Sequence, residues 1–293
     1  MELNLEFYTG VDLYSDGVVE DQLLSIVKNK ESIHEVLTGN SDWAVLYHLS
    51  PLRRNLLEWY HFKANARILE VGAGCGALTG LLCEKGTEVT AVELSKKRAQ
   101  IIAERHREAT NLEIIVGNLK DIKFKKKYDY ITLIGVLEYA GQFIEDSSPY
   151  ERFLDSLMQL LKPDGTLIIA IENRYGLKYW SGASEDHTGN VFEGLENYPV
   201  DRGVRTFSKK ELESVLEKVG FRDNRFYYPM PDYKLPTQVF SDKYLPRPGD
   251  LRNFEYYDRD RLMLFNEKLL FDGLSQNEAF SFFSNSFLVF SKL

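Results

Sequence analysis

Residues 68–79 read ILEVGAGCGALT, and this stretch decides the fold. A short apolar run comes first, the glycines Gly72, Gly74 and Gly76 follow, and a helical pattern begins directly after them. Glycine is needed where the backbone turns sharply or where a ligand approaches the main chain closely. The stretch therefore predicts a strand, a tight turn that holds a ligand, and the start of a helix.

Outward from this stretch, short apolar runs alternate with amphipathic segments. This alternation indicates βαβ units and an α/β fold, in which a doubly wound, mostly parallel seven-stranded sheet carries helices on both faces. Capping boxes at 148–151 and 208–211 predict the starts of two helices. The expected strands are 68–71, 89–92, 112–116, 130–134 and 166–171, with 226–228 and 287–290 completing the sheet.

The chain shows no repeat and no low-complexity linker, which argues against two domains on a flexible tether. Residues 1–62 read as an N-terminal helical cap, and residues 63–293 read as the main domain. Two stretches, 173–205 and 229–280, break the alternation and are rich in Tyr, Asp, Gly and Pro. Loops this long in a compact domain are usually functional, so we expect two insertions on the ligand side.

Composition narrows the classes of partner. The net charge of -8 and the pI near 5.3 repel a phosphate backbone, so nucleic acid is not an expected partner. The lysine run at 123–127 reads as a solvated turn. Two cysteines, Cys75 and Cys83, supply neither a disulfide framework nor a zinc site, so no metal is expected and the compartment is reducing. Residues 1–7 do not resemble a signal peptide, and no apolar run is long enough for a membrane span, so we expect a cytoplasmic protein.

The glycine stretch fits two kinds of cofactor. Gly72, Gly74 and Ala77 also match the dinucleotide pattern G-x-G-x-x-G/A, which would indicate a nicotinamide or flavin enzyme. Glu70, at the end of the strand, favours a ligand with an ammonium group and would repel a pyrophosphate. Glu93 ends the next strand, where a carboxylate accepts hydrogen bonds from ribose hydroxyls in both kinds of enzyme.

Three further motifs follow in order. They are Val116-Gly117-Asn118-Leu119, the run from Tyr128 to Tyr139 that contains Gly135 and Glu138, and Leu161-Lys162-Pro163-Asp164-Gly165. With the glycine loop and Glu93, they make the sequence of residues 65–225 resemble class I, Rossmann-like S-adenosylmethionine-dependent methyltransferases. A histidine often follows the glutamate of the fourth-strand loop in that family. Tyr139 stands there instead, which argues against a catalytic role at that position.

The resemblance implies a cofactor site for S-adenosylmethionine. Glu70 would take the methionine ammonium group, and Glu93 would take the ribose. The side chain of Asn118 would take the adenine amino group, and the amide of Leu119 would meet the ring. The remaining residues that the resemblance assigns to the cofactor are Gly72, Gly74, Gly76 and Gly135.

Segments 171–174, 184–189 and 229–234 resemble methyltransferase modules associated with bacterial glycosyltransferases and surface-polysaccharide synthesis. This narrower resemblance implies a sugar hydroxyl or a glycan terminus as acceptor. It also implies a glycosyltransferase as a partner or as part of a longer fused chain.

The acceptor is expected at the insertions, because ligands of doubly wound sheets bind at the carboxyl ends of the strands. Tyr175, Tyr179 and Trp180 either stack on a flat acceptor or pack the insertion against the core. Asp186 and Tyr233 are the other candidate contacts. The remaining histidines, His34, His48, His61 and His106, read as surface or capping residues.

A hydroxyl acceptor needs a base, and His187 is the only histidine in the predicted acceptor-side insertion. Glu185 and Asp186 beside it are placed to raise its basicity or orient its ring. Glu172, at the end of the fifth strand, is the second candidate for the base.

The function that these patterns favour is O-methylation of a carbohydrate or another small polar acceptor. N-methylation of an amine is an alternative within the same fold. A non-catalytic cofactor-binding module that serves a glycosyltransferase, and an NAD-linked oxidoreductase, are the alternatives from other classes.

Overall fold

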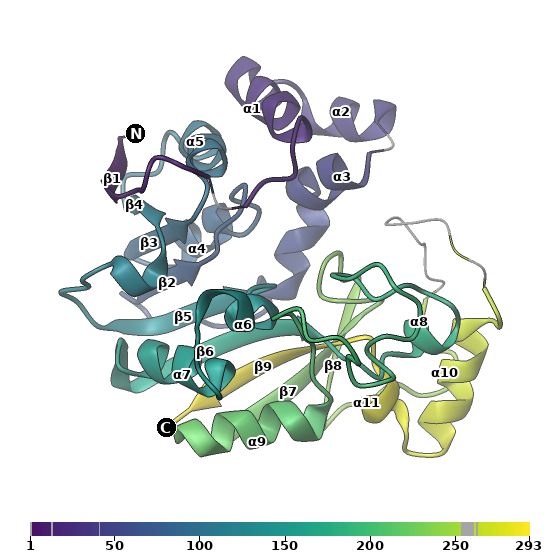
Figure 1. Ribbon diagram of the computed structural model, residues 1–293. Coiled ribbons are helices and arrows are strands. Elements are labelled where there is room, and N and C mark those ends of the chain that lie inside the picture. Colours follow the sequence, from purple (N-terminus) through teal and green to yellow (C-terminus); the bar gives the residue numbers. More distant parts are fainter. Residues whose placement is uncertain (1, 13, 41, 253–260, 262) are drawn as a thin grey trace. The chain divides into compact units, whose positions relative to one another are not determined.

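The computed structural model describes residues 2–12, 14–40, 42–252, 261 and 263–293. Two compact units make up the chain. The first comprises Met1–Leu133 with Leu160–Gly165, and the second comprises Ile134–Gln159 with Thr166–Leu293. Residues 1–62 lie within the first unit (Figure 1).

The first unit is built on parallel strands in the order β1-β4-β3-β2-β5. Helices α4 (Thr79–Lys85) and α5 (Lys96–Arg105) follow β2 and β3, and the 3-10 helix η2 (Leu119–Asp121) follows β4. The strands predicted from the apolar runs are confirmed. Their bounds, with β1 included, are β1 (Leu3–Phe7), β2 (Arg67–Val71), β3 (Glu88–Glu93), β4 (Leu112–Gly117) and β5 (Tyr128–Ile134).

Strand β1 corrects the prediction of an entirely helical N-terminus. Leu3 pairs with Ile114, and Phe7 pairs with Gly117, so the segment extends the sheet beside β4. Gly117 permits this close approach, since a Cβ on it would lie 2.7 Å from the Phe7 backbone oxygen. Long-range pairing thus decided the conformation of a segment whose local pattern is too short to predict it.

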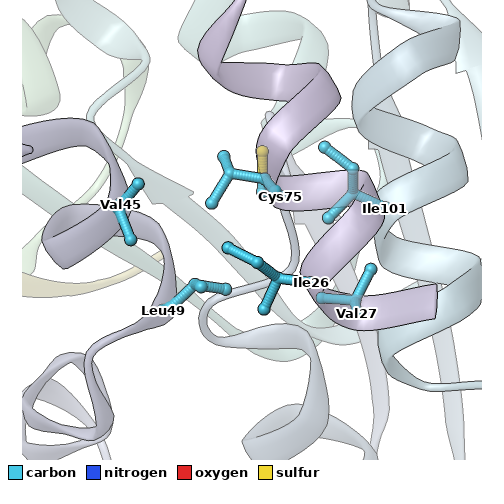
Figure 2. Packing of buried hydrophobic residues seen from close by; sticks show 7 residues of the cluster. Ile26, Val27, Val45, Leu49, Cys75 and Ile101 are labelled. Atoms are coloured by element: carbon cyan, nitrogen blue, oxygen red, sulfur yellow. The ribbon is translucent and has the colours of Figure 1, made fainter. Parts of the chain in front are cut away.

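The remaining N-terminal helices are α1 (Val19–Asn29), α2 (Ile33–Gly39), α3 (Trp43–Leu49) and the 3-10 helix η1 (Pro51–Leu56). The helix predicted at 19–27 is confirmed. Ile26, Val45 and Leu49 pack with Ile101 and with Cys75 of the glycine loop (Figure 2). Each buried aliphatic side chain contributes about 1.5–3 kcal/mol. The N-terminal helices therefore support the glycine loop from one side.

In the second unit, the part of β6 from Thr166 onward pairs antiparallel with β9, and the strand order is β6-β9-β7-β8. The predicted fold class is confirmed, but the described residues form nine strands where seven were expected. The two additions are β1 and the short strand β8, which pairs with β7 inside the predicted second insertion. The bounds are β6 (Leu161–Glu172), β7 (Asp223–Met230), β8 (Gln238–Ser241) and β9 (Ser286–Lys292).

Two capping predictions had different outcomes. Ser208 and Glu211 form the reciprocal capping box that begins α9 (Lys209–Val219), as predicted. At α7 (Pro149–Met158) the capping box is wrong, because the Ser148 side chain makes no cap hydrogen bond. The Ser148 amide instead donates to Asp146 Oδ1 at 2.8 Å, so the acidic turn before the helix satisfies this donor.

The insertions contain short elements. The first carries α8 (Leu177–Trp180), and the second carries β8 and α10 (Glu267–Gln276). Residues 253–260 and 262 of the predicted insertion at 229–280 lie outside the described residues. The other short helices of the second unit are η3 (Leu137–Tyr139), α6 (Ala140–Phe143) and α11 (Phe280–Phe283). None of the helices in the described ranges combines the length and the apolar character needed to cross a membrane.

Candidate functional site

The glycine loop of the first unit turns through three residues with positive φ. Gly72, Gly74 and Gly76 have φ angles of 69°, 57° and 77°. A Cβ placed on Gly74 would meet nothing within 4 Å, whereas a Cβ on Gly76 would lie 3.0 Å from His106 Nε2. Gly74 therefore leaves open space of the kind a cofactor fills, and Gly76 is needed for packing.

Glu93 reaches the glycine loop from the end of β3. Its Oε2 accepts a hydrogen bond from the Gly74 amide at 2.7 Å, and its Oε1 accepts one from the Ser95 amide at 3.0 Å. Burial raises the pKa of Glu93, against the charge of Arg98 and these amide hydrogen bonds. The structure thus brings together two residues that the sequence assigned to the cofactor. Each carboxylate oxygen keeps a lone pair that a ribose hydroxyl can use.

Glu70 is buried at the end of β2. Its Oε2 accepts a hydrogen bond from Thr79 Oγ1 at 2.6 Å. Burial raises the pKa of Glu70 to about 7, although the hydrogen bond from Thr79 lowers it. A carboxylate held this far from water gains most from a cationic partner, which suits the predicted contact with the methionine ammonium group. That contact stays a prediction.

We expect the free energy of unfolding to depend less on pH in the Glu70→Gln variant than in the unmodified protein. The folded pKa of about 7 exceeds the ordinary value of 4.5, so the stabilising effect of the proton is present below pH 4.5 and is lost as the pH rises through 7. Between pH 4.5 and 7.5, the free energy of unfolding of the cofactor-free protein should fall by up to about 3 kcal/mol more than that of the variant. Urea titrations at both pH values measure this difference.

The exposed Glu113 of β4 supplies the control for that experiment. Glu113→Gln should follow the unmodified protein at both pH values. If the free energy of unfolding changed equally with pH in the unmodified protein and in Glu70→Gln, the elevated pKa of Glu70 would be contradicted.

The other predicted cofactor residues are distributed over both units. Asn118 follows β4 and caps η2, where its Oδ1 accepts a hydrogen bond from the Lys120 amide at 3.2 Å. Leu119 is the first residue of η2, a position whose amide receives no acceptor from the helix itself. Gly135 belongs to the second unit, and a Cβ on it would lie 2.8 Å from the Tyr233 hydroxyl.

The sequence analysis missed a charged network next to the glycine loop. Arg98 of α5 pairs with Glu20 at 2.7 Å and with Asp16 at 2.5 Å, and Asp16 also contacts His48 Nε2 at 3.0 Å. Asp12 accepts the Lys96 amide at 2.7 Å and so caps the same helix. No local signal could have revealed these contacts, because they join residues 32 to 84 positions apart in the sequence.

The prediction that every remaining histidine is a surface or capping residue is wrong for His48, whereas His106 is the C-cap residue of α5 as that prediction allows. His48 is buried against Asp16, and burial lowers its pKa, although the hydrogen bond with Asp16 raises it. His106 Nε2 lies 2.8 Å from the Gly76 carbonyl oxygen and fills the space beside the glycine loop. His48 lies in α3, and His106 directly follows α5.

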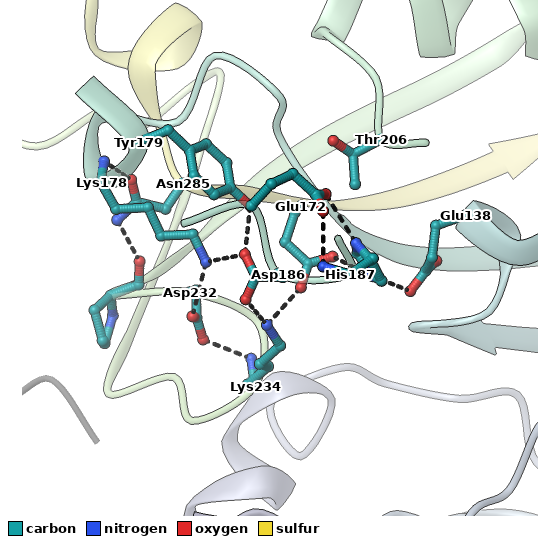
Figure 3. Close-up of polar contacts among 12 residues, drawn as sticks. Glu138, Glu172, Lys178, Tyr179, Asp186, His187, Thr206, Asp232, Lys234 and Asn285 are labelled. Carbon is teal, nitrogen blue, oxygen red and sulfur yellow. Dashed lines mark hydrogen bonds and ion pairs between the residues drawn. The ribbon is translucent and has the colours of Figure 1, made fainter. Parts of the chain in front are cut away.

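A second polar cluster is built entirely within the second unit, around His187 (Figure 3). His187 Nδ1 lies 2.9 Å from Glu185 Oε1, and Nε2 lies 3.4 Å from Glu138 Oε1 and 4.0 Å from Glu172 Oε2. Glu138 lies in η3 after β5, Glu172 ends β6, and the other two lie in the first insertion. The predicted pairing of Glu185 with His187 is confirmed.

The surrounding carboxylates control the charge of His187. Burial lowers its pKa, but the hydrogen bonds with Glu138 and Glu185 and the charge of Glu172 outweigh burial and raise the pKa well above its usual value. The raised pKa favours the protonated ring, and an imidazolium does not act as a base. The catalytic role predicted for His187 remains a prediction, and its charge state favours Glu172 as the proton acceptor.

Asp186 turns away from His187 toward two lysines. Its carboxylate pairs with Lys178 at 2.8 Å and with Lys234, and it accepts a hydrogen bond from the Tyr179 hydroxyl. Burial raises its pKa, but the two lysine charges outweigh burial and hold the pKa well below the usual range. Lys234 Nζ also lies 2.6 Å from Glu172 Oε1, which joins the lysines to the His187 cluster. Lys234 lies in the second insertion, which was predicted to lie on the ligand side, whereas no role was predicted for Lys178.

The aromatic candidates in the insertions differ in exposure. Tyr179 is 3% exposed and packs the insertion, which is the second of the two interpretations of the sequence. Tyr175 stacks on Phe282 with ring centroids 5.3 Å apart, and Tyr233 is buried beside Gly135. Trp180 is 44% exposed. Acceptor contacts of these side chains stay predictions, and Trp180 has the most accessible surface.

A parallel sheet with a glycine turn after β2 and an acid at the end of β3 defines a Rossmann-like, nucleoside-binding α/β protein. The family described as a methyltransferase domain matches residues 45–224, and the chain belongs to that family. It is an S-adenosylmethionine-dependent methyltransferase, as the sequence predicted, and this decides against the nicotinamide alternative.

Known relatives cover much of the chain at low identity. Ribosomal RNA small subunit methyltransferase A of Mycoplasma mycoides is 25% identical over 209 residues, which is 70% of this chain and 69% of the relative. The ubiquinone biosynthesis O-methyltransferase of Rickettsia canadensis is 24% identical over 173 residues, which is 56% of this chain and 70% of the relative. The names of these relatives point to unlike acceptors, so the similarity does not select one.

A solved structure shows the same fold. A methyltransferase from Thermotoga maritima superimposes with a TM-score of 0.50 and 14% identity, covering 92% of this chain and 99% of that chain. Identity at this level supports the fold and carries no information about the acceptor.

Proposed function

We propose that this methyltransferase transfers the methyl group to a hydroxyl of a carbohydrate or another small polar acceptor. The observation that carries the proposal is the buried cluster of Glu138, Glu172 and His187, which can receive and hold a proton. An amine acceptor is already nucleophilic and needs no such group, whereas a hydroxyl acceptor does. S-adenosylmethionine supplies an electrophilic methyl group when it is bound.

In the proposed reaction, the acceptor oxygen attacks the methyl carbon while the bond from that carbon to sulfur breaks. The products are the methyl ether and S-adenosylhomocysteine, and the hydroxyl proton passes to Glu172. Lys234 Nζ, 2.6 Å from Glu172 Oε1, forms an ion pair with this carboxylate and holds it in place before the transfer. His187 orients the carboxylates of Glu138 and Glu172.

Two features favour a small polar acceptor. The net charge of -8 disfavours RNA, and the exposed face of Trp180 suits stacking on a sugar ring. The resemblance of segments 171–174, 184–189 and 229–234 to methyltransferase modules of polysaccharide synthesis favours the same acceptor class. The same resemblance supports a glycosyltransferase as partner.

The test is transfer of a labelled methyl group to panels of sugars, oligosaccharides, phenols, amines and ribosomal RNA. Label in a base-stable ether of a sugar or oligosaccharide is the expected result. Label in an amine or in RNA would overturn the proposal. Cofactor binding without transfer to any panel, but with stimulation of a glycosyltransferase, would support the non-catalytic alternative.

Replacing Glu93 by alanine should weaken the binding of S-adenosylhomocysteine by about 1.5–3 kcal/mol, or roughly 10- to 150-fold. The variant loses a charged acceptor for the ribose and the hydrogen bond that holds the Gly74 amide at 2.7 Å. Isothermal titration calorimetry measures the change. Glu113→Ala, an exposed carboxylate on the neighbouring strand β4, is the control and should bind normally. Equal affinity for the two variants would refute the assignment of Glu93.

A further inference from the structure

Three buried carboxylate oxygens near His187 lack hydrogen bonds from the described residues. They are Glu138 Oε2 and both oxygens of Glu172. Glu138 is 1% exposed and Glu172 is 0% exposed. Lys234 forms an ion pair with Glu172 Oε1, and the nearest cationic group to Glu172 Oε2 is His187 Nε2 at 4.0 Å. Buried carboxyl oxygens without a hydrogen bond are costly, so these three oxygens can accept a further partner.

The three side chains converge on one point. One ligand atom from each of Glu138, Glu172 and His187 lies within 4.8 Å of the other two, as Figure 3 shows for their side chains. A cation with bonds of about 2.1 Å separates neighbouring ligand atoms by about 3.0–3.4 Å. The His187 Nε2 distances of 3.4 Å to Glu138 and 4.0 Å to Glu172 need only a small contraction to match.

The far side of the His187 ring has the partner that metal-binding histidines use. Nδ1 faces Glu185 Oε1 at 2.9 Å, which leaves Nε2 directed at the other two carboxylates. Glu185 is itself fixed by the amides of His187 and Thr188, both at 2.7 Å, and by the Tyr198 hydroxyl at 3.2 Å. A carboxylate that orients the ring and its tautomer is the usual support of a histidine ligand.

The charge of the network is also unbalanced. A connected series of ion pairs runs from Glu138 to Lys178. Within the described residues, this series contains five carboxylates, two lysines and one histidine. A divalent cation would offset the excess of negative charge in this buried region. The two lysines pair with Asp186, Asp232 and Glu172, whereas Glu138 pairs with His187.

We propose that Glu138, Glu172 and His187 form a binding site for one divalent transition-metal cation, with Glu185 as the residue that orients the histidine. Two carboxylates and one imidazole are ligands that suit Mn²⁺ or Zn²⁺, whereas Ca²⁺ prefers sites in which every ligand is an oxygen. A role in holding the acceptor oxygen rests on the proposed function, whereas metal binding itself does not.

The experiment uses the full chain after treatment with a chelator, with Mn²⁺ as the probe. Equilibrium dialysis should give one ion per chain, and electron paramagnetic resonance should show nitrogen coupling from His187. Glu138→Gln and His187→Ala should weaken Mn²⁺ binding at least 10-fold. Glu185→Gln should weaken it in the same direction by a smaller factor. Competition with Zn²⁺ reports whether both ions use the site.

Glu196→Gln, an exposed carboxylate of the same insertion, is the matched control and should bind Mn²⁺ normally. Circular dichroism and binding of S-adenosylhomocysteine verify that each variant is folded. Failure to bind either Mn²⁺ or Zn²⁺, or unchanged binding in Glu138→Gln, would overturn the metal site. Methyl transfer measured in parallel separates the two proposals, since normal transfer to a hydroxyl without metal binding would overturn only this one.

Discussion

Replacing His187 by alanine should lower methyl transfer to the true acceptor by about 100-fold or more. The side chain is the only cation within 4.0 Å of both Glu138 and Glu172 among the described residues, and its removal leaves their carboxylates without orientation. The loss should appear in kcat. Affinity for S-adenosylhomocysteine should change by less than about twofold, because the glycine loop and Glu93 belong to the first unit.

Folding must be checked in this variant, because breaking a buried ion pair can cost about 3–5 kcal/mol. His187→Gln retains a polar side chain and serves as the second variant, and His61→Ala, an exposed histidine, serves as the control. Glu172→Gln should match the loss in kcat if Glu172 accepts the proton. Full turnover by folded His187→Ala would remove this residue from the reaction and leave Glu172 to be tested alone.

The strands of the first unit could be predicted because their signals are local. An apolar run followed by glycines or by an acid marks each strand end, and β2, β3 and β4 end close to the predicted residues. Strands β1 and β8 could not be predicted in this way. Each is short and partly exposed, and each depends on a neighbouring strand for its hydrogen bonds.

The candidate sites were predictable to different degrees for the same reason. Gly74 and Glu93 follow consecutive strands, so topology alone brings them together. The pairing of Glu185 with His187 is also local, being two residues apart. Glu138 and Lys234 lie 49 and 47 residues from His187 in the sequence (187 - 138 and 234 - 187), and no periodic pattern connects them. Their roles became visible only when the folded chain placed them beside Glu172 or His187.

Replacing Gly74 by valine should reduce the binding of S-adenosylmethionine below detection in calorimetry. Gly74 has φ of +57°, and a Cβ there would enter space that no protein atom occupies within 4 Å. In the cofactor-bound protein that space is the predicted place of the methionine portion, so a branched side chain would exclude the ligand sterically. Its amide is also the donor to Glu93 Oε2, so displacement of the loop would move both predicted contacts at once.

Backbone strain must be separated from ligand exclusion, because a β-branched residue at positive φ costs roughly 1–3 kcal/mol wherever it occurs. Gly249→Val provides the match, since Gly249 has φ of +90°, likewise has nothing within 4 Å of a Cβ, and lies in the second unit. Both variants should lose stability in urea titrations, but only Gly74→Val should lose the cofactor. Gly74→Ala, with a smaller side chain, should bind with intermediate affinity. Tight binding by a folded Gly74→Val protein would show that the cofactor does not approach this part of the loop.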